Sequence, residues 1–69
     1  MKISARNVLK GTVTAIREGS VNSEVIVEVA PGVEMASIIT KASCEHLGLA
    51  VGKKAYVIIK ASNVMLGAD

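Results

Sequence analysis

The sequence predicts a small all-β domain with one short helix, an OB-like five-stranded Greek-key barrel that assembles as a homo-oligomer. Apolar and polar residues alternate with period two in the early segments, and a helical stretch interrupts them once. The 69-residue chain has a single cysteine and a single histidine, so it can form neither an internal disulfide nor a zinc site from these residues alone. Because a domain this small buries only about 60% of its unfolded surface, self-association is expected. A small SH3-like barrel is the alternative fold.

The first part of the chain predicts three strands, at residues 8–17, 23–30 and 33–40. In the second of these, Val25, Val27 and Val29 share one face of the strand, while Glu24 and Glu28 lie on the other, which is typical of a half-buried strand. Pro31-Gly32 predicts the turn that follows it. Gly11 inside the first strand predicts a bulge or a close backbone approach.

A helix of one or two turns is expected at residues 41–47, where the period of two ends. Either Thr40 or Ser43 suits the N-cap, and a cap at Ser43 would place Glu45 in the first turn, where the helix dipole favours an acid. Gly48 suits the position just beyond the end of the helix.

The remaining strands are expected at residues 53–60 and, as a short closing edge, at residues 63–66. Residues 56–59 are apolar on both faces of the fourth strand. A small domain with one core covers only one face, so the second face predicts a contact between subunits. Residues 1–69 form a single domain.

The charge balance argues against several classes of partner. Eight Lys and Arg residues face six Asp and Glu residues, for a net charge of +2, and the cations form no run. Tyr56 is the only aromatic residue, so single-stranded nucleic acid would find almost nothing to stack on. No stretch is long and apolar enough for a membrane span, and the first residues lack the apolar core of a signal peptide. A cytoplasmic protein with neither nucleic acid nor membrane as a partner is expected.

A binding protein is favoured over an enzyme. Nucleophilic catalysis needs a nucleophile, a base and an orienting group. Cys44 and His46 lie two positions apart, which places them on different faces of a helix. Cys44 is expected to be a small buried apolar residue, and His46 a solvated one.

Anion binding is indicated by four segments rich in hydrogen-bond donors and free of acids. They lie before the first strand, at the end of the third, at the start of the helix and at the end of the fourth strand. Arg and Lys supply charge, and Ser and Thr supply hydroxyl donors. If the segments converge, within a subunit or across an interface, they form a pocket for a small tetrahedral oxyanion. The alternative is that these residues only cap, turn or solvate the chain. The segments are Ser4–Asn7, Ser37–Thr40, Lys41–Ser43 and Lys60–Asn63.

The whole chain resembles the molbindin (Mop) family of small molybdate-binding proteins. The resemblance rests on the opening Ser-Ala-Arg-Asn with its following Leu-Lys-Gly, and on the closing Ile-Ile-Lys-Ala-Ser, and it runs over nearly the full length. It implies an OB-type fold and a hexamer that binds molybdate or tungstate at subunit interfaces. Related domains form the ligand-binding part of molybdate-responsive regulators and of molybdate transport ATPases. No cofactor is implied, because the metal is bound as its oxyanion.

Positions that match the oxyanion-contacting segments of molbindins can be carried over to this chain. Arg6 and Lys60 would supply charge, and the others hydroxyl or backbone N–H donors. Asn7 either only orders its own loop or contributes, together with the turn at residues 19–22, to a possible second class of site near a symmetry axis. The resemblance assigns the first site to Ser4, Arg6, Thr40, Ser43, Lys60, Ala61 and Ser62. The second site would use Asn7, Gly19, Ser20, Val21 and Asn22.

Two positions depart from the family pattern. Val8 stands where Gln is common, and Ala36 stands where Ser or Thr is frequent. Neither change touches Arg6 or Lys60, so the oxyanion function is expected to remain. Two other classes of function stay open: a small barrel that binds nucleic acid, and a purely structural assembly module.

Overall fold

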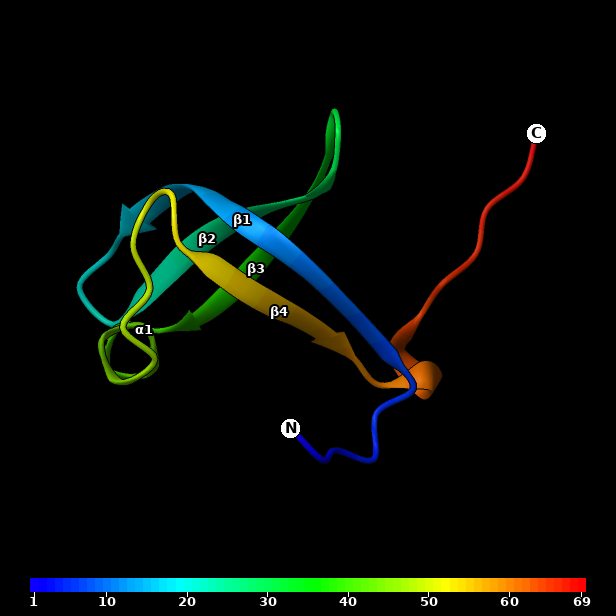
Figure 1. Ribbon diagram of the computed structural model, residues 1–69, viewed down its shortest axis with the longest axis horizontal. Helices are drawn as coiled ribbons and strands as arrows, with labels where there is room; N and C mark the ends of the chain where they lie inside the picture. Colours follow the sequence, from blue (N-terminus) through cyan, green and yellow to red (C-terminus); the bar gives the residue numbers. More distant parts are fainter.

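The computed structural model describes residues 1–69 as four strands, one α-helix and one 3-10 turn (Figure 1). All four strands pair antiparallel in one curled sheet of order β3-β2-β1-β4. The last strand returns to lie beside the first, which is the Greek-key order, so that part of the prediction is confirmed. The elements are β1 (Asn7–Glu18), β2 (Asn22–Ala30), β3 (Val33–Thr40), α1 (Lys41–His46), β4 (Lys54–Ile59) and η1 (Ala61–Asn63).

Gly11 marks the close approach that the sequence predicted. A Cβ at this position would overlap the backbone carbonyl oxygen of Glu28 and lie 2.7 Å from Cγ1 of Val27, so only glycine lets β1 and β2 meet there. The irregularity in the β1–β2 register lies farther along, between Val13 and Ala15. Gly11 therefore serves the strand crossing and not the bulge.

Thr40 is the residue that caps α1. Its Oγ1 accepts a hydrogen bond from the backbone N of Ser43 at 3.0 Å, and Gly48 follows the helix with a φ of 66°. Of the two predicted caps, Thr40 is thus confirmed. The alternative cap at Ser43, which would have placed Glu45 in the first turn, is wrong, because the helix begins at Lys41 and its first turn holds no acid. No helix in the structure has both the length and the apolar character needed to cross a bilayer.

The buried core is very small. Four apolar side chains are fully enclosed between the curled sheet and α1, namely Val13, Val25, Val27 and Cys44. Cys44 is 5% exposed and lies among these valines, as expected for a small apolar residue. One face of β2 thus packs into the core as predicted, with its valines on the inner face and its glutamates on the outer face.

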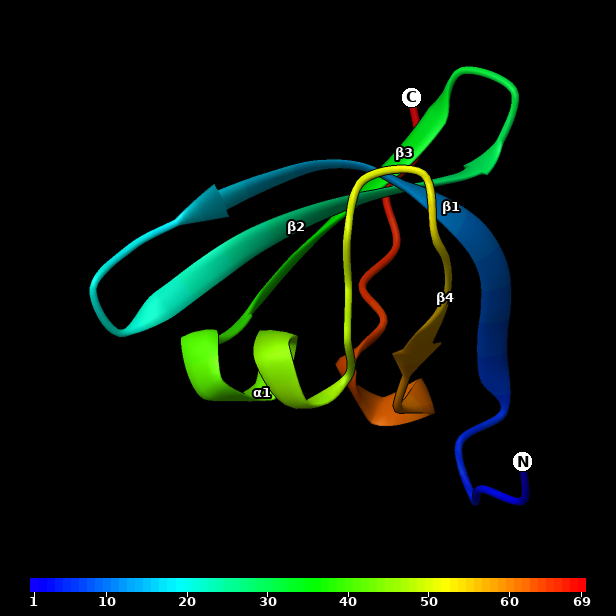
Figure 2. The ribbon, with the colours of Figure 1, turned by 60° about the vertical axis from the view of Figure 1, so that its left-hand side comes forward.

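The single chain does not form the predicted closing strand at residues 63–66. Residues 61–63 form η1 instead, and residues 64–69 belong to no strand. A strand needs a hydrogen-bonded neighbour, and Figure 1 shows the tail leading away from the sheet beyond η1; in the turned view of Figure 2 the same tail passes behind the sheet. The free edges of β3 and β4 consequently stay unpaired within one chain.

Candidate functional site

The first and fourth donor segments meet where β1 begins and β4 ends. Antiparallel pairing sets Asn7 opposite Ile59, so the residues just before β1 lie beside those just after β4. Together they line an open groove of about 670 Å³, which we call the basic groove. Its lining residues are Ile3, Ser4, Ala5, Arg6, Ile58, Lys60, Ala61, Ser62 and Asn63.

The basic groove is electropositive. It is lined by two cations, Arg6 and Lys60, and by no acid. The single ion pair of the structure lies elsewhere, between Arg17 and Glu24 with Nη1 and Oε1 3.8 Å apart. Both groove cations therefore keep their charge available, and hydroxyls and amides stand beside them.

The sequence pattern did not predict the apolar walls of the basic groove. Ile3 and Ile58 line it next to the donors. The alternation of β4 could have predicted Ile58, because residues two apart in a strand share a face and Lys60 lies two residues after Ile58. Apolar walls keep water from competing for the donors once the groove is covered.

The other donors of the expected site, Thr40 and Ser43, form a second group that we call the helix cap. Thr40 Oγ1 donates to Ser43 Oγ at 2.7 Å, in addition to accepting the backbone N–H of Ser43. Both side chains are exposed. The hydroxyl proton of Ser43 has no partner within the chain and is free for a ligand.

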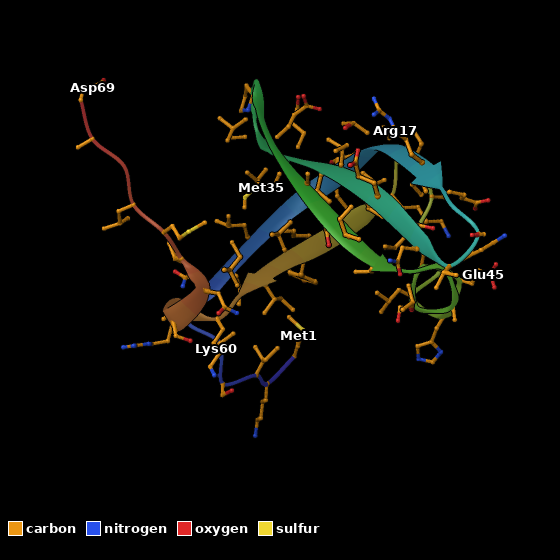
Figure 3. All side chains as sticks on the ribbon, turned by 180° about the vertical axis from the view of Figure 1, so that it is seen from behind. Met1, Arg17, Met35, Glu45, Lys60 and Asp69 are labelled. Atoms are coloured by element: carbon orange, nitrogen blue, oxygen red, sulfur yellow. The ribbon has the colours of Figure 1, made fainter.

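The basic groove and the helix cap lie apart in one chain. β1 runs from one to the other, since its first residue pairs with Ile59 and its last with Ser23, next to Asn22, which pairs with Thr40. A strand of this length extends roughly 35 Å along its path. Figure 3 shows Lys60 well separated from Glu45, which follows the helix cap. One chain thus does not bring all the expected oxyanion ligands together.

The residues of the expected second site also separate. Asn7 lies at the basic groove, whereas Gly19–Asn22 form the turn at the far end of β1. That turn closes with a Gly19 N to Asn22 O bond of 2.8 Å, and the carbonyl of Val21 accepts the backbone N–H of Lys41 at 2.8 Å. The turn therefore packs beside the helix cap and not beside Asn7.

A second, mostly apolar groove of about 420 Å³ follows the open seam between the free edges of β3 and β4. Val57 and Ile39 line it from the two edges, and Leu49 from the loop between α1 and β4. Tyr56 and Ile58 stay 53% and 40% exposed beside it. The apolar second face of β4 predicted by the sequence is thus present and uncovered.

Comparison with known proteins identifies the family. The TOBE domain pattern matches residues 3–66. A probable molybdenum-pterin-binding protein from Haemophilus influenzae is 49% identical over 69 residues, which cover 100% of both chains. The chain belongs to the molbindin (Mop) family. The family resemblance noted in the sequence is therefore confirmed.

Solved molbindin structures share the fold. MopII from Clostridium pasteurianum superposes with a TM-score of 0.91 at 42% identity, covering 97% of this chain and 100% of MopII. The cytoplasmic molybdate-binding protein ModG, in a form with molybdate bound, gives a TM-score of 0.94 at 46% identity. The match spans 100% of this chain and 49% of the ModG chain. The OB-like curled sheet is thus the molbindin fold, and the SH3-like alternative is not needed.

Proposed function

We propose that this molbindin binds and stores molybdate or tungstate at sites formed between the subunits of a cytoplasmic homo-oligomer, and that it catalyses no reaction. The observation that carries the proposal is the basic groove, where Arg6 and Lys60 stand among hydroxyl groups without an acid. A dianion that leaves water must be met by several oriented donors, because an unpaired buried charge is prohibitively costly. Molybdenum binding by the relatives supports the same ligand.

The separation of the basic groove from the helix cap supports a site built by two chains. The groove supplies charge and the cap supplies the free hydroxyl of Ser43, but they lie at opposite ends of β1. Two chains packed antiparallel bring the groove of each against the cap of the other. Molybdate then bridges the subunits and stabilises the assembly by mass action.

The surface of a single chain supports self-association independently. It exposes 5393 Å², whereas a compact monomer of 7.1 kDa would expose about 4,100 Å². The excess exceeds the roughly 800 Å² that one partner contributes to a standard interface. Met65 and Leu66 in the tail are 92% and 96% exposed.

The tail and the open seam complement each other. The apolar seam groove lies between two unpaired strand edges, and residues 64–66 are an apolar, extended segment without a partner. A tail from a second chain that enters the seam would pair those edges and bury both apolar surfaces. The fifth strand of the barrel then comes from a neighbour. A hexamer is the assembly that the molbindin resemblance implies.

Two other classes of function have less support. A nucleic-acid module needs aromatic stacking, and Tyr56 is the only aromatic residue of the chain. A purely structural module leaves the two unpaired cations of the basic groove without a purpose.

Equilibrium dialysis of the intact oligomer against molybdate tests the proposal. Uptake at micromolar ligand is expected, with tungstate competing, and thermal melts are expected to rise with either ion. The matched comparison is sulfate, and a labelled oligonucleotide at low salt tests the nucleic-acid class. No molybdate uptake by an oligomer that melts cooperatively would refute the storage function, and a melting temperature indifferent to molybdate would favour the structural module.

A further inference from the structure

A side-chain hydrogen bond joins the two segments that build the basic groove. Nδ2 of Asn7 donates to the carbonyl oxygen of Ile59 at 3.2 Å, across 52 positions of sequence. Asn7 is half-buried and directly follows Arg6, while Ile59 directly precedes Lys60. The bond therefore lies between the two groove cations without itself lining the groove.

Three successive carbonyl groups follow one another where β4 ends near the groove, and each accepts a hydrogen bond. The carbonyl of Lys60 accepts from Asn63 N at 2.9 Å, and that of Ala61 accepts from Val64 N at 3.3 Å. Ile59 accepts from Asn7. A carbonyl oxygen carries partial negative charge and repels an anion, whereas one held in a hydrogen bond cannot turn toward the ligand.

Of these three carbonyl groups, only the one at Ile59 accepts from a side chain, and this bond adds to the backbone pairing of Ile59 with Asn7 in the β1–β4 ladder. The other two are held by the backbone turn of η1, which no single side-chain truncation removes. Substitution of Asn7 can therefore remove the side-chain hydrogen bond that helps to hold the Ile59–Lys60 segment in place.

We infer that Asn7 is a positioning residue of the oxyanion site. Its amide adds a side-chain hydrogen bond to the backbone pairing of Asn7 with Ile59 and so holds the Ile59–Lys60 link, which keeps Lys60 on the same groove as Arg6. The inference rests on the proposed function and adds a residue that acts through Lys60 and not by contact with the ligand. It also gives Asn7 a role separate from the Gly19–Asn22 turn.

Asn7→Leu is the informative variant, because leucine nearly matches asparagine in shape and has no donor. Thr14→Val is the matched control. Thr14 Oγ1 also donates from β1 to another strand, to Glu34 Oε2 at 3.2 Å or to the carbonyl of Ile26 at 3.4 Å, and none of these residues lines the groove. Molybdate affinity of the assembled oligomer is expected to fall about tenfold in Asn7→Leu, since the Ile59–Lys60 link loses the side-chain hydrogen bond that fixes it beside the start of β1. Thr14→Val is expected to bind as the parent does.

A double-variant cycle separates positioning from general destabilisation. If Asn7 acts through Lys60, Asn7→Leu costs much less affinity in a Lys60→Ala background than in the parent. Parent-like affinity in Asn7→Leu, or losses that simply add in the double variant, would overturn the inference.

A readout without ligand keeps the two proposals distinguishable. Backbone amide chemical shifts of residues 60–63 in the ligand-free protein are expected to move in Asn7→Leu and to stay in Thr14→Val. Unmoved shifts overturn the positioning role whether or not molybdate binds. If the parent takes up no molybdate but Asn7→Leu still moves these chemical shifts, the storage function fails while the positioning of Lys60 by Asn7 is supported.

Discussion

Mixed oligomers of two damaged chains should recover molybdate binding that neither chain has alone. The first chain carries Arg6→Ala and Lys60→Ala, which removes both charges from the basic groove. The second carries Ser43→Asp, which places a carboxylate at the helix cap. An acid there suits the start of α1 but opposes a dianion.

The structure sets the size of each effect. A charge-assisted hydrogen bond contributes about 1.5–3 kcal/mol, so the loss of two cations weakens binding by at least about a hundredfold. Two like charges at ~4 Å cost roughly 4 kcal/mol near a protein surface, so Ser43→Asp empties the site as well. If each site joins the groove of one chain to the cap of another, random 1:1 assembly leaves about a quarter of the sites with both halves intact.

The assay is molybdate uptake by equilibrium dialysis after the two chains are unfolded and refolded together, with mixing verified by mass spectrometry of the intact oligomer. Each chain refolded alone should take up no molybdate at ligand concentrations that saturate the parent. Zero uptake by verified mixed oligomers would refute the shared site, because a site within one chain always keeps its defect.

Three further outcomes follow from the packing. Gly11→Ala should lower the free energy of unfolding by about 1–3 kcal/mol in urea titrations, since its Cβ meets the backbone of β2; Gly67→Ala, which meets nothing within 4 Å, should be neutral. Ser23→Ala should leave the urea midpoint unchanged or raise it, because Ser23 Oγ is buried without a hydrogen-bond partner; a large loss would reveal a partner supplied by the assembly. A chain ending at Asn63 should sediment as a smaller species than the parent, and parent-like sedimentation would show that the tail closes no seam.

The sequence predicted most of the local structure. Alternation located the four observed strands to within one residue, because each strand of this small sheet buries one face, and β3 was placed at residues 33–40 without error. It also predicted the approach at Gly11 and the helix end at Gly48. The single chain does not contain the alternative cap at Ser43 or a strand at residues 63–66. Both lie at the ends of elements, where contacts with neighbouring segments, which the local pattern does not contain, decide the structure.

Donor chemistry was readable from residue types, but its arrangement was not. Ser4, Arg6, Lys60 and Ser62 were grouped by composition and resemblance, and antiparallel pairing of β1 with β4 places them around one groove. Nothing in the spacing of Thr40 and Ser43 revealed that they lie at the other end of the molecule. Asn7 looked like a loop residue, since its bond to Ile59 spans most of the chain.

By itself, the sequence of this molbindin determined which residues enter the sheet, which carry donors and which family the chain resembles, because alternation and residue chemistry are local properties. Only the tertiary structure decided that the donors divide between two ends of β1, that the seam between β3 and β4 stays open, and that the tail leaves the sheet. These features depend on the curl and register of the paired strands, which place residues far apart in the sequence next to each other in a way that no local pattern predicts.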